Sequence, residues 1–290
     1  LMKNINEFGL YLRERAHWTH NIISKSAMFR LGIMEETITD MHLFSIADEF
    51  SDNVLAKKFN RREEGSKSGA DWLWIIGEPG SWLPLLIQAK IINPQTGNCQ
   101  RLDYKDGEQR KRLLAYARQH GFVPLYCIYS SIPSEFEPPK CFAQDGRPIE
   151  DWACSFVSPK TVRLLSNAGV KNQREILKYA IPWMEPFCLV STHCEPHGQS
   201  IATSIENIRD NFGEENRHKL TGKASGQKET SLRKRTSWEN LDATQAVRAN
   251  IPSNLCKWFN EWSSELSQAP LSGASIISSV PITQIEELNV

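Results

Sequence analysis

The sequence has no run of about 18 apolar residues and no surplus of charge of either sign. The first absence gives no reason to expect a membrane-spanning helix. The second, 34 Lys and Arg residues against 34 Asp and Glu residues, excludes a polycationic nucleic-acid coat protein but leaves a local basic face open. The phosphate-binding motifs GxxxxGKS/T and GxGxxG are also missing, so nothing indicates a nucleotide-binding loop.

Cysteine is present, but its distribution does not indicate a disulfide framework. The chain has 7 cysteines, an odd number, and no CxxC pair. A chain of 290 residues with 40% hydrophobic residues can bury a core without disulfides, so we expect reduced thiols. The charged, amphipathic start at residues 1–20 lacks the apolar stretch of a secretory signal. Together these features predict a cytoplasmic protein.

Hydrophobic periodicity and turn residues predict an alternation of helices and strands. Helices are expected at 3–31, 36–50 and 104–120, and strands at 71–76, 82–92 and 121–131, with room for one more strand near 52–60. The strand at 82–92 should begin after Pro84, because proline is poorly placed inside a ladder. The Gly- and Ser-rich segment 59–70 is predicted to be a loop. The fold class is therefore α/β, with a small mixed sheet flanked by helices.

Two regions are predicted along the chain. Residues 1–200 would hold the N-terminal helix and the α/β core, and residues 201–290 would be mostly helical. A basic linker is expected at 213–240, either as a solvated tether or as a contact to phosphates. A short amphipathic helix at 252–268 could dock a partner protein.

Three polar residues stand out against the apolar strands. Asp71 opens one strand, and Gln88 and Lys90 lie two residues apart on the next, so their side chains share a face. The hairpin should bring Asp71 close to that pair. A polar pair in so apolar a strand is costly unless it has partners or solvent. The structural alternative is a turn residue beside ordinary polar residues at a sheet edge.

This arrangement suits a metal-dependent phosphodiesterase. The Asp71 carboxylate supplies the hard oxygen that Mg²⁺ prefers, and a bound metal polarises the scissile phosphate. Lys90 would position the attacking water and neutralise charge in the transition state. Stepping back along the apolar stripe of the helix at 36–50 reaches Glu36, which we therefore favour over Glu35 as a second carboxylate.

These residues and their order resemble the PD-(D/E)xK nuclease superfamily, whose restriction-endonuclease-like core is αβββαβ. The resemblance covers about a third of the chain, with Ala70 in place of the proline and Gln88 in place of the second acidic residue. This QxK form is similar to the variant of Mrr-type restriction endonucleases. The stretch also resembles an uncharacterised bacterial, defence-associated family that shares a GADW…QAK…Y…Q pattern.

The resemblance implies a site and an activity. Glu36, Asp71 and Gln88 would bind Mg²⁺ or Mn²⁺, and Lys90 would be the catalytic lysine. The helix that follows would present Gln109 toward the site, with Tyr104 nearby. The implied function is a Mg²⁺-dependent endonuclease that hydrolyses DNA phosphodiester bonds in bacterial defence or restriction. It would act alone, as a homodimer or with a partner protein of a defence system.

Two alternatives remain open at this level. The same fold with a disabled site would be a module that binds nucleic acid or protein without cleaving. Gln109 and Tyr104 can equally be structural or solvated residues. If the chain does bind duplex DNA, the local cations Arg110, Lys111 and Arg112 are expected to contact its phosphates.

Overall fold

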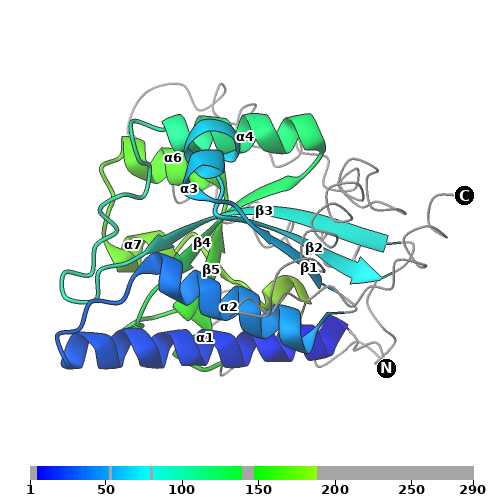
Figure 1. Ribbon diagram of the computed structural model, residues 1–290. Coiled ribbons are helices and arrows are strands. Elements are labelled where there is room, and N and C mark those ends of the chain that lie inside the picture. The colour runs from blue at the N-terminus through cyan, green and yellow to red at the C-terminus, as the bar shows by residue number, and fades with distance from the viewer. Residues whose placement is uncertain (1–4, 52–53, 79–80, 139–146, 188–290) are drawn as a thin grey trace, which may run out of the picture.

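The computed structural model describes residues 5–51, 54–78, 81–138 and 147–187. This part of the chain is α/β, with a mixed sheet of six strands between two layers of helices (Figure 1). The α-helices are α1 (Ile5–Met28), α2 (Glu35–Glu49), α3 (Arg61–Glu63), α4 (Glu108–His120), α6 (Pro159–Asn167) and α7 (Gln173–Leu177). The strands are β1 (Val54–Lys58), β2 (Trp72–Glu78), β3 (Ser81–Ile91), β4 (Val123–Tyr129), β5 (Cys154–Val157) and β6 (Ile181–Pro182). Helices α1 and α2 cover one face of the sheet, and α4 and α6 cover the other (Figure 1).

The strands lie in the order β1-β2-β3-β4-β5-β6, and each pairs with its neighbours. Only β3 and β4 are parallel, and α4 lies between them in the chain as the crossover that a parallel pair requires. The other pairs are antiparallel. In the hairpin of β2 and β3, Trp72 is opposite Ile87, which places Asp71 beside Gln88.

The order helix, three strands, helix, strand expected from the sequence is confirmed, and two details differ. Strand β3 begins at Ser81 and includes Pro84. Pro84 is tolerated because β4 pairs with β3 only from Leu85 onward, so Pro84 has a strand on one side alone. The predicted loop at 59–70 holds α3 and a π-helix, η1 (Glu64–Ser68).

The start of α3 has a capping box that the sequence already contains. The Asn60 side chain accepts hydrogen bonds from the N–H groups of Arg62 and Glu63, and the Glu63 carboxylate accepts one from the N–H of Asn60. This N-x-x-E pattern satisfies N–H groups that a helix start leaves without partners. Some polar residues of this segment therefore cap a helical turn, and the segment is not simply a loop.

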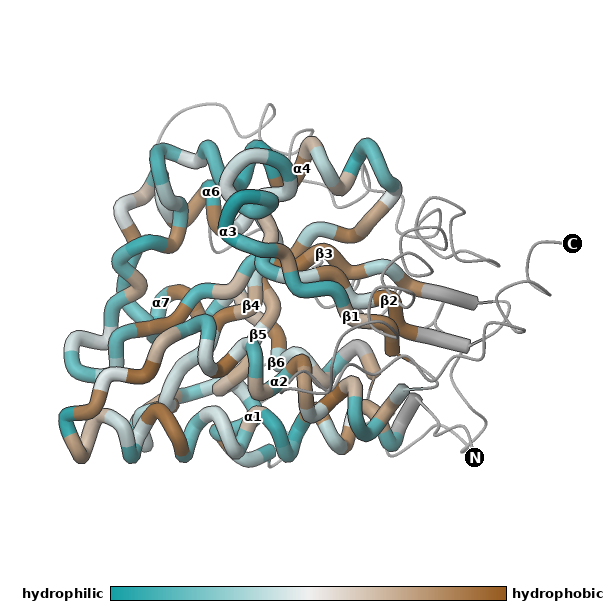
Figure 2. Tube along the Cα trace, in the orientation of Figure 1, coloured by the Kyte–Doolittle hydropathy of each residue, from teal (hydrophilic) through white to brown (hydrophobic). Residues whose placement is uncertain are grey.

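Buried hydrophobic residues of the sheet and of both helix layers form one core. The most hydrophobic stretches of the Cα trace lie on the strands (Figure 2). Trp72 and Trp74 are buried, so they belong to the core and are not exposed platforms for bases. Cys99, Cys127 and Cys154 are buried free thiols, as expected. None of the helices described here has the length and apolar character needed to cross a bilayer. The predicted region 201–290, with its basic linker and its terminal helix, lies outside the described residues.

Helix α4 packs closely on Gly69, the residue that ends η1. Gly69 has φ of 63°, in the left-handed region that favours glycine. A Cβ added there would lie 2.3 Å from the carbonyl oxygen of Gln109 and 2.7 Å from the backbone nitrogen of Leu113. Both are backbone atoms of α4, so the clash cannot be relieved by a side-chain rotation. This glycine sets the distance between α4 and the strand that begins just after Asp71.

We expect Gly69→Ala to lower the free energy of unfolding by about 2–4 kcal/mol, since it combines left-handed strain with overpacking. Gly97→Ala is the control for strain alone, because Gly97 has φ of 64° but open space around its Cα, and it should cost about 1 kcal/mol. Gly65→Ala, with no positive φ and no neighbour, should change stability by less than about 0.5 kcal/mol. Urea unfolding measures all three. A Gly69→Ala variant no less stable than Gly97→Ala would contradict the close packing of α4.

Candidate active site

Asp71 is held in place by the backbones of two strands and by Gln88. Its N–H donates to the carbonyl of Ile87 at 2.9 Å, and its carbonyl accepts from Phe59 at 2.8 Å. The side-chain Oδ2 accepts from the N–H of Ala89 at 2.6 Å and from the Gln88 amide. The other carboxylate oxygen has no hydrogen-bond partner among the described residues. The prediction that the hairpin brings Asp71 to Gln88 is therefore confirmed.

Lys90 lies near the end of β3 and is only 7% exposed. Its ammonium group makes no ion pair or hydrogen bond with any residue described in the structure. It does attract three carboxylates electrostatically, those of Glu35, Glu64 and Asp71. An ammonium group held in a pocket without a direct partner is costly, and it is well suited to bind an anion or a water molecule from solvent.

Glu35, not Glu36, is the carboxylate that α2 brings to Asp71 and Lys90. Glu35 accepts a hydrogen bond from the N–H of Ile91 on β3 at 2.9 Å. Glu36 is exposed and forms an ion pair with Arg61 at 3.1 Å. The choice made from the sequence followed a stripe through Leu43, which is indeed buried, but the buried face of the helix also includes Ile38 and His42. Stepping back from that set by helical spacing reaches Glu35.

Glu64 is a further acidic residue at the site that the sequence analysis missed. It is the first residue of η1, and its carboxylate accepts a hydrogen bond from the Gln109 amide on α4 at 2.7 Å. π-Helical turns are rare and are frequent at functional sites. Gln109 thus does lie at the site, as the resemblance implied. Nothing in the polar sequence around Glu64 distinguishes Glu64 from its acidic neighbour Glu63 as a site residue.

The carboxylates at the site resist ionisation. Burial raises the pKa of Asp71 well above its usual range, and the nearby Glu35 carboxylate raises it further, against the opposing effect of Lys90. Burial likewise raises the pKa values of Glu35 and Glu64, again opposed by Lys90. One ammonium group therefore does not balance three clustered carboxylates, and an added cation would.

The residues present fit a divalent cation that takes oxygen ligands. Glu35 and Asp71 supply carboxylates, and the Oε1 atom of Gln88 is buried without a hydrogen-bond partner. The Oε1 atom of Gln109 is also buried and unpartnered. Within the described ranges, no three Asp, Glu, His or Cys side chains are grouped closely enough to hold a metal by themselves. This agrees with Mg²⁺, which proteins bind through one or two carboxylates together with waters and substrate phosphates.

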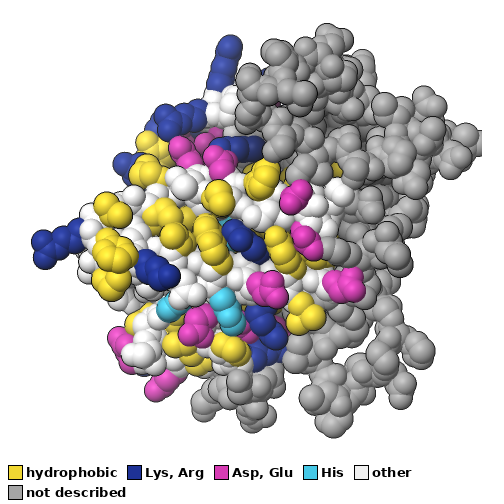
Figure 3. Space-filling view, turned by 60° about the horizontal axis from the view of Figure 1, so that its bottom comes forward, with side chains coloured by type: hydrophobic (Ala, Val, Ile, Leu, Met, Phe, Trp, Pro, Cys, Tyr) yellow, Lys and Arg dark blue, Asp and Glu magenta, His cyan; other side chains and the backbone are white. Residues whose placement is uncertain are grey.

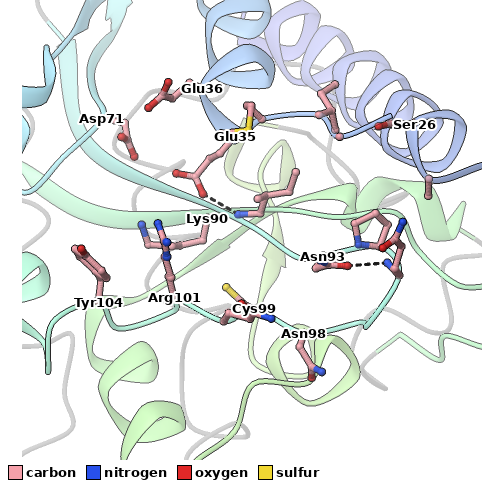
Figure 4. Close-up of a pocket in the computed structure, with 18 of the residues that line it drawn as sticks. Ser26, Glu35, Glu36, Asp71, Lys90, Asn93, Asn98, Cys99, Arg101 and Tyr104 are labelled. Atoms are coloured by element: carbon pink, nitrogen blue, oxygen red, sulfur yellow. Dashed lines mark hydrogen bonds between the residues drawn. The ribbon is translucent and has the colours of Figure 1, made fainter. Parts of the chain in front are cut away.

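Glu35, Glu64, Asp71, Lys90 and Gln109 line a pocket of about 880 Å³, and Gln88 is buried behind Asp71 rather than part of the lining. Figure 4 shows Glu35, Asp71 and Lys90 converging from α2, from the residue before β2 and from β3. The rest of the pocket is lined by the α1–α2 connection and by residues of the segment 93–104. Its volume falls within the range of about 300–1,000 Å³ that is typical of ligand sites.

Two of the cations expected to contact duplex phosphates are engaged elsewhere. Arg110 is buried and pairs with Asp103 at 3.2 Å. Arg112 pairs with Glu108 and donates to the carbonyl of Gly65. Lys111 is exposed on the same helix. The expectation for Arg110 is therefore wrong, because the segment before α4 supplies a carboxylate that the sequence pattern did not connect with it.

Comparison with protein-family models finds one match, to the family of unknown function DUF6615, over residues 9–277. The chain belongs to the DUF6615 family. Comparison with curated proteins finds no match. In this DUF6615 protein the matched residues include Glu35, Glu64, Asp71, Gln88 and Lys90.

The raised pKa of Asp71 predicts how the stability of this DUF6615 protein changes with pH. Because its folded-state pKa is raised, Asp71 favours folding in its protonated form. That contribution is fully present below the unfolded-state pKa of about 3.9 and is lost as the pH rises through the higher folded-state pKa. At neutral pH Asp71 therefore lowers stability, because its carboxyl ionises freely only in the unfolded chain.

We expect Asp71→Asn to be more stable than the wild type at pH 7 in EDTA, by about 0.5–2 kcal/mol. Asparagine keeps an oxygen to accept from Ala89 and removes the charge. The gain should shrink as the pH falls through the raised folded-state pKa of Asp71 and should be absent below about 4, where the carboxyl is neutral in both the folded and the unfolded state. Asp40→Asn is the control, because it removes an exposed carboxylate paired with Lys58 and should not stabilise. Thermal unfolding across this pH range would contradict the account if Asp71→Asn gave no gain at pH 7.

Proposed function

We propose that the protein is a Mg²⁺-dependent nuclease that hydrolyses DNA phosphodiester bonds. The observation that carries the proposal is the convergence of Glu35 and Asp71 with the unpaired Lys90 in one pocket. Gln88, whose amide donates to Asp71, adds a buried oxygen without a partner. Carboxylates with an adjacent lysine are what phosphodiester hydrolysis requires, because the reaction needs a bound cation, a positioned water and compensation of negative charge.

The order of elements supports the same proposal. Helix α2, strands β1 to β3, helix α4 and strand β4 follow the αβββαβ order of the restriction-endonuclease-like core. In that scheme the helix supplies Glu35, β2 begins next to Asp71, and β3 carries Gln88 and Lys90. We assign the second acidic position of the motif to Gln88 and the contribution of the first helix to Glu35 in place of Glu36.

The chemistry of the proposed reaction is a hydrolysis. Glu35, Asp71 and Gln88 would hold Mg²⁺ or Mn²⁺, which when bound lowers the pKa of coordinated water and neutralises phosphate charge. Lys90 orients the attacking water by hydrogen bonding. The water oxygen forms a bond to phosphorus, and the bond from phosphorus to the 3′ oxygen breaks. One proton of the water passes to solvent, and the 3′ oxygen takes up a proton from solvent. The products are a 5′-phosphate and a 3′-hydroxyl. Glu64, which accepts a hydrogen bond from Gln109, attracts Lys90 electrostatically and would help to hold it in place.

Cleavage of plasmid and linear DNA by the purified full chain tests the proposal. We expect cleavage with Mg²⁺ and none with EDTA, and we expect Lys90→Ala and Asp71→Asn each to reduce the rate by at least about 100-fold, the size of losing a transition-state charge contact. Cleavage that neither substitution reduces would contradict the proposal. No cleavage by the wild type, with salt-sensitive DNA binding retained, would instead indicate a module that binds nucleic acid without cutting.

The neighbouring glutamates of α2 provide a matched pair. We expect Glu35→Gln to lose at least about 100-fold in cleavage rate and Glu36→Gln less than about tenfold. Glu35 interacts electrostatically with Lys90 and Asp71, whereas Glu36, which also lines the pocket, is exposed and pairs with Arg61. The two substitutions change the same charge in adjacent positions, so general charge effects cancel. Equal losses, or a larger loss for Glu36→Gln, would refute the assignment of Glu35.

A further inference from the structure

Two segments that line the pocket take no part in the proposed hydrolysis, and they form two of its walls. One wall is the segment 93–104, which carries Arg101 and Tyr104, and the other is the connection between α1 and α2. Figure 4 shows Arg101 and Tyr104 on the side of Lys90 opposite Glu35. Because Lys90 is only 7% exposed, a substrate phosphate must enter between these walls to reach it.

Tyr104 is an exposed aromatic ring with two cations over it. Its side chain is 42% exposed, whereas most aromatic side chains of the described residues are buried. The guanidinium carbon of Arg101 lies 5.7 Å from the ring centroid, and the Lys105 ammonium lies 5.5 Å from it. An exposed ring flanked by cations is the combination that stacks on a base and contacts its phosphates.

The backbone beneath Tyr104 is held in a specific conformation. Lys105 and Asp106 have φ of 51° and 52°, and Gly107 has φ of 84°. Non-glycine residues adopt this region only where the surroundings enforce it. The buried ion pair between Arg110 and Asp103 supplies that constraint, since it ties the segment to α4. Tyr104 thus lies on a turn that this ion pair connects to α4.

The opposite wall is apolar and exposed. Phe29, Leu31 and Met34 are each more than 60% exposed, and Leu31 and Met34 line the pocket. Hydrophobic side chains are also visible at this end of the molecule in the space-filling view (Figure 3). In a continuous duplex the base faces are stacked inside the helix, so an apolar wall would meet the charged phosphates. An unpaired strand offers the base faces themselves.

We infer that the pocket receives an unpaired DNA strand, with one base stacked on Tyr104 and an adjacent phosphate at Lys90. The substrate class is then single-stranded or frayed DNA, such as an overhang or flap, rather than continuous duplex. The inference rests on the proposed nuclease function and specifies its substrate. It also agrees with the engagement of Arg110 and Arg112 in ion pairs, which leaves Lys111 and Arg118 as the exposed cations of α4.

The test uses the full chain in EDTA with a 20-nucleotide single strand that carries 2-aminopurine, and with the same strand in a blunt duplex. Stacking on a tyrosine quenches the fluorescence of this base. We expect quenching and tighter binding for the single strand. Tyr104→Ala should abolish the quenching and weaken single-strand binding by about tenfold or more, and Tyr104→Phe should restore both. Phe44→Ala, which removes an exposed aromatic ring on α2 outside the pocket lining, is the control and should bind like the wild type.

Cleavage of the same oligonucleotides with Mg²⁺ separates this inference from the function on which it rests. Equal binding and cleavage of single strand and blunt duplex, or wild-type binding by Tyr104→Ala, would overturn the inference even if Lys90-dependent cleavage is present. Quenching that depends on Tyr104 without any cleavage would support the inference and refute the nuclease. Equal losses in Tyr104→Ala and Phe44→Ala would also overturn it, since the effect would then not belong to the pocket.

Discussion

The rest of the site depends on the electrostatic imbalance around Lys90. Three carboxylates, those of Glu35, Glu64 and Asp71, lie within its influence, and burial makes each of them harder to ionise. Lys90 itself has no direct ionic partner in the described part of the chain. Such an arrangement lowers the stability of the empty protein. It becomes favourable when a cation joins the carboxylates and an anion joins the lysine, which is the pairing that a metal ion and a phosphodiester provide.

Backbone hydrogen bonds and close packing in the fold hold these carboxylates near Lys90. The hairpin of β2 and β3 positions Asp71 against Gln88, and the bond from Ile91 to Glu35 ties α2 to the end of β3. Gly69 lets α4 approach closely enough for Gln109 to reach Glu64. Because these contacts come from the backbone or from adjacent residues, the carboxylates cannot separate without disrupting the sheet or the helix packing around it.

The core of the site could be predicted from sequence because it depends on local geometry. Side chains alternate between the two faces of a strand, so Gln88 and Lys90 share a face, and one hairpin brings Asp71 close to them. Glu35 required knowledge of which face of α2 meets the sheet, and that face is defined by Ile38 and His42 rather than by Leu43 alone. Glu64 could not be found, since its position follows from a π-helical turn. The pairing of Arg110 with Asp103 also depends on the unusual backbone of residues 105–107.

The central claim is that Glu35 and Asp71 share one divalent cation beside Lys90. Anomalous diffraction from crystals of the full chain soaked in Mn²⁺ tests it most directly. We expect one strong peak at coordination distance, about 2.1 Å for a Mg²⁺-like ion, from carboxylate oxygens of both Glu35 and Asp71, and its loss in Asp71→Asn. An ordered pocket without a peak between these two residues, at Mn²⁺ concentrations that occupy other sites, would contradict the account.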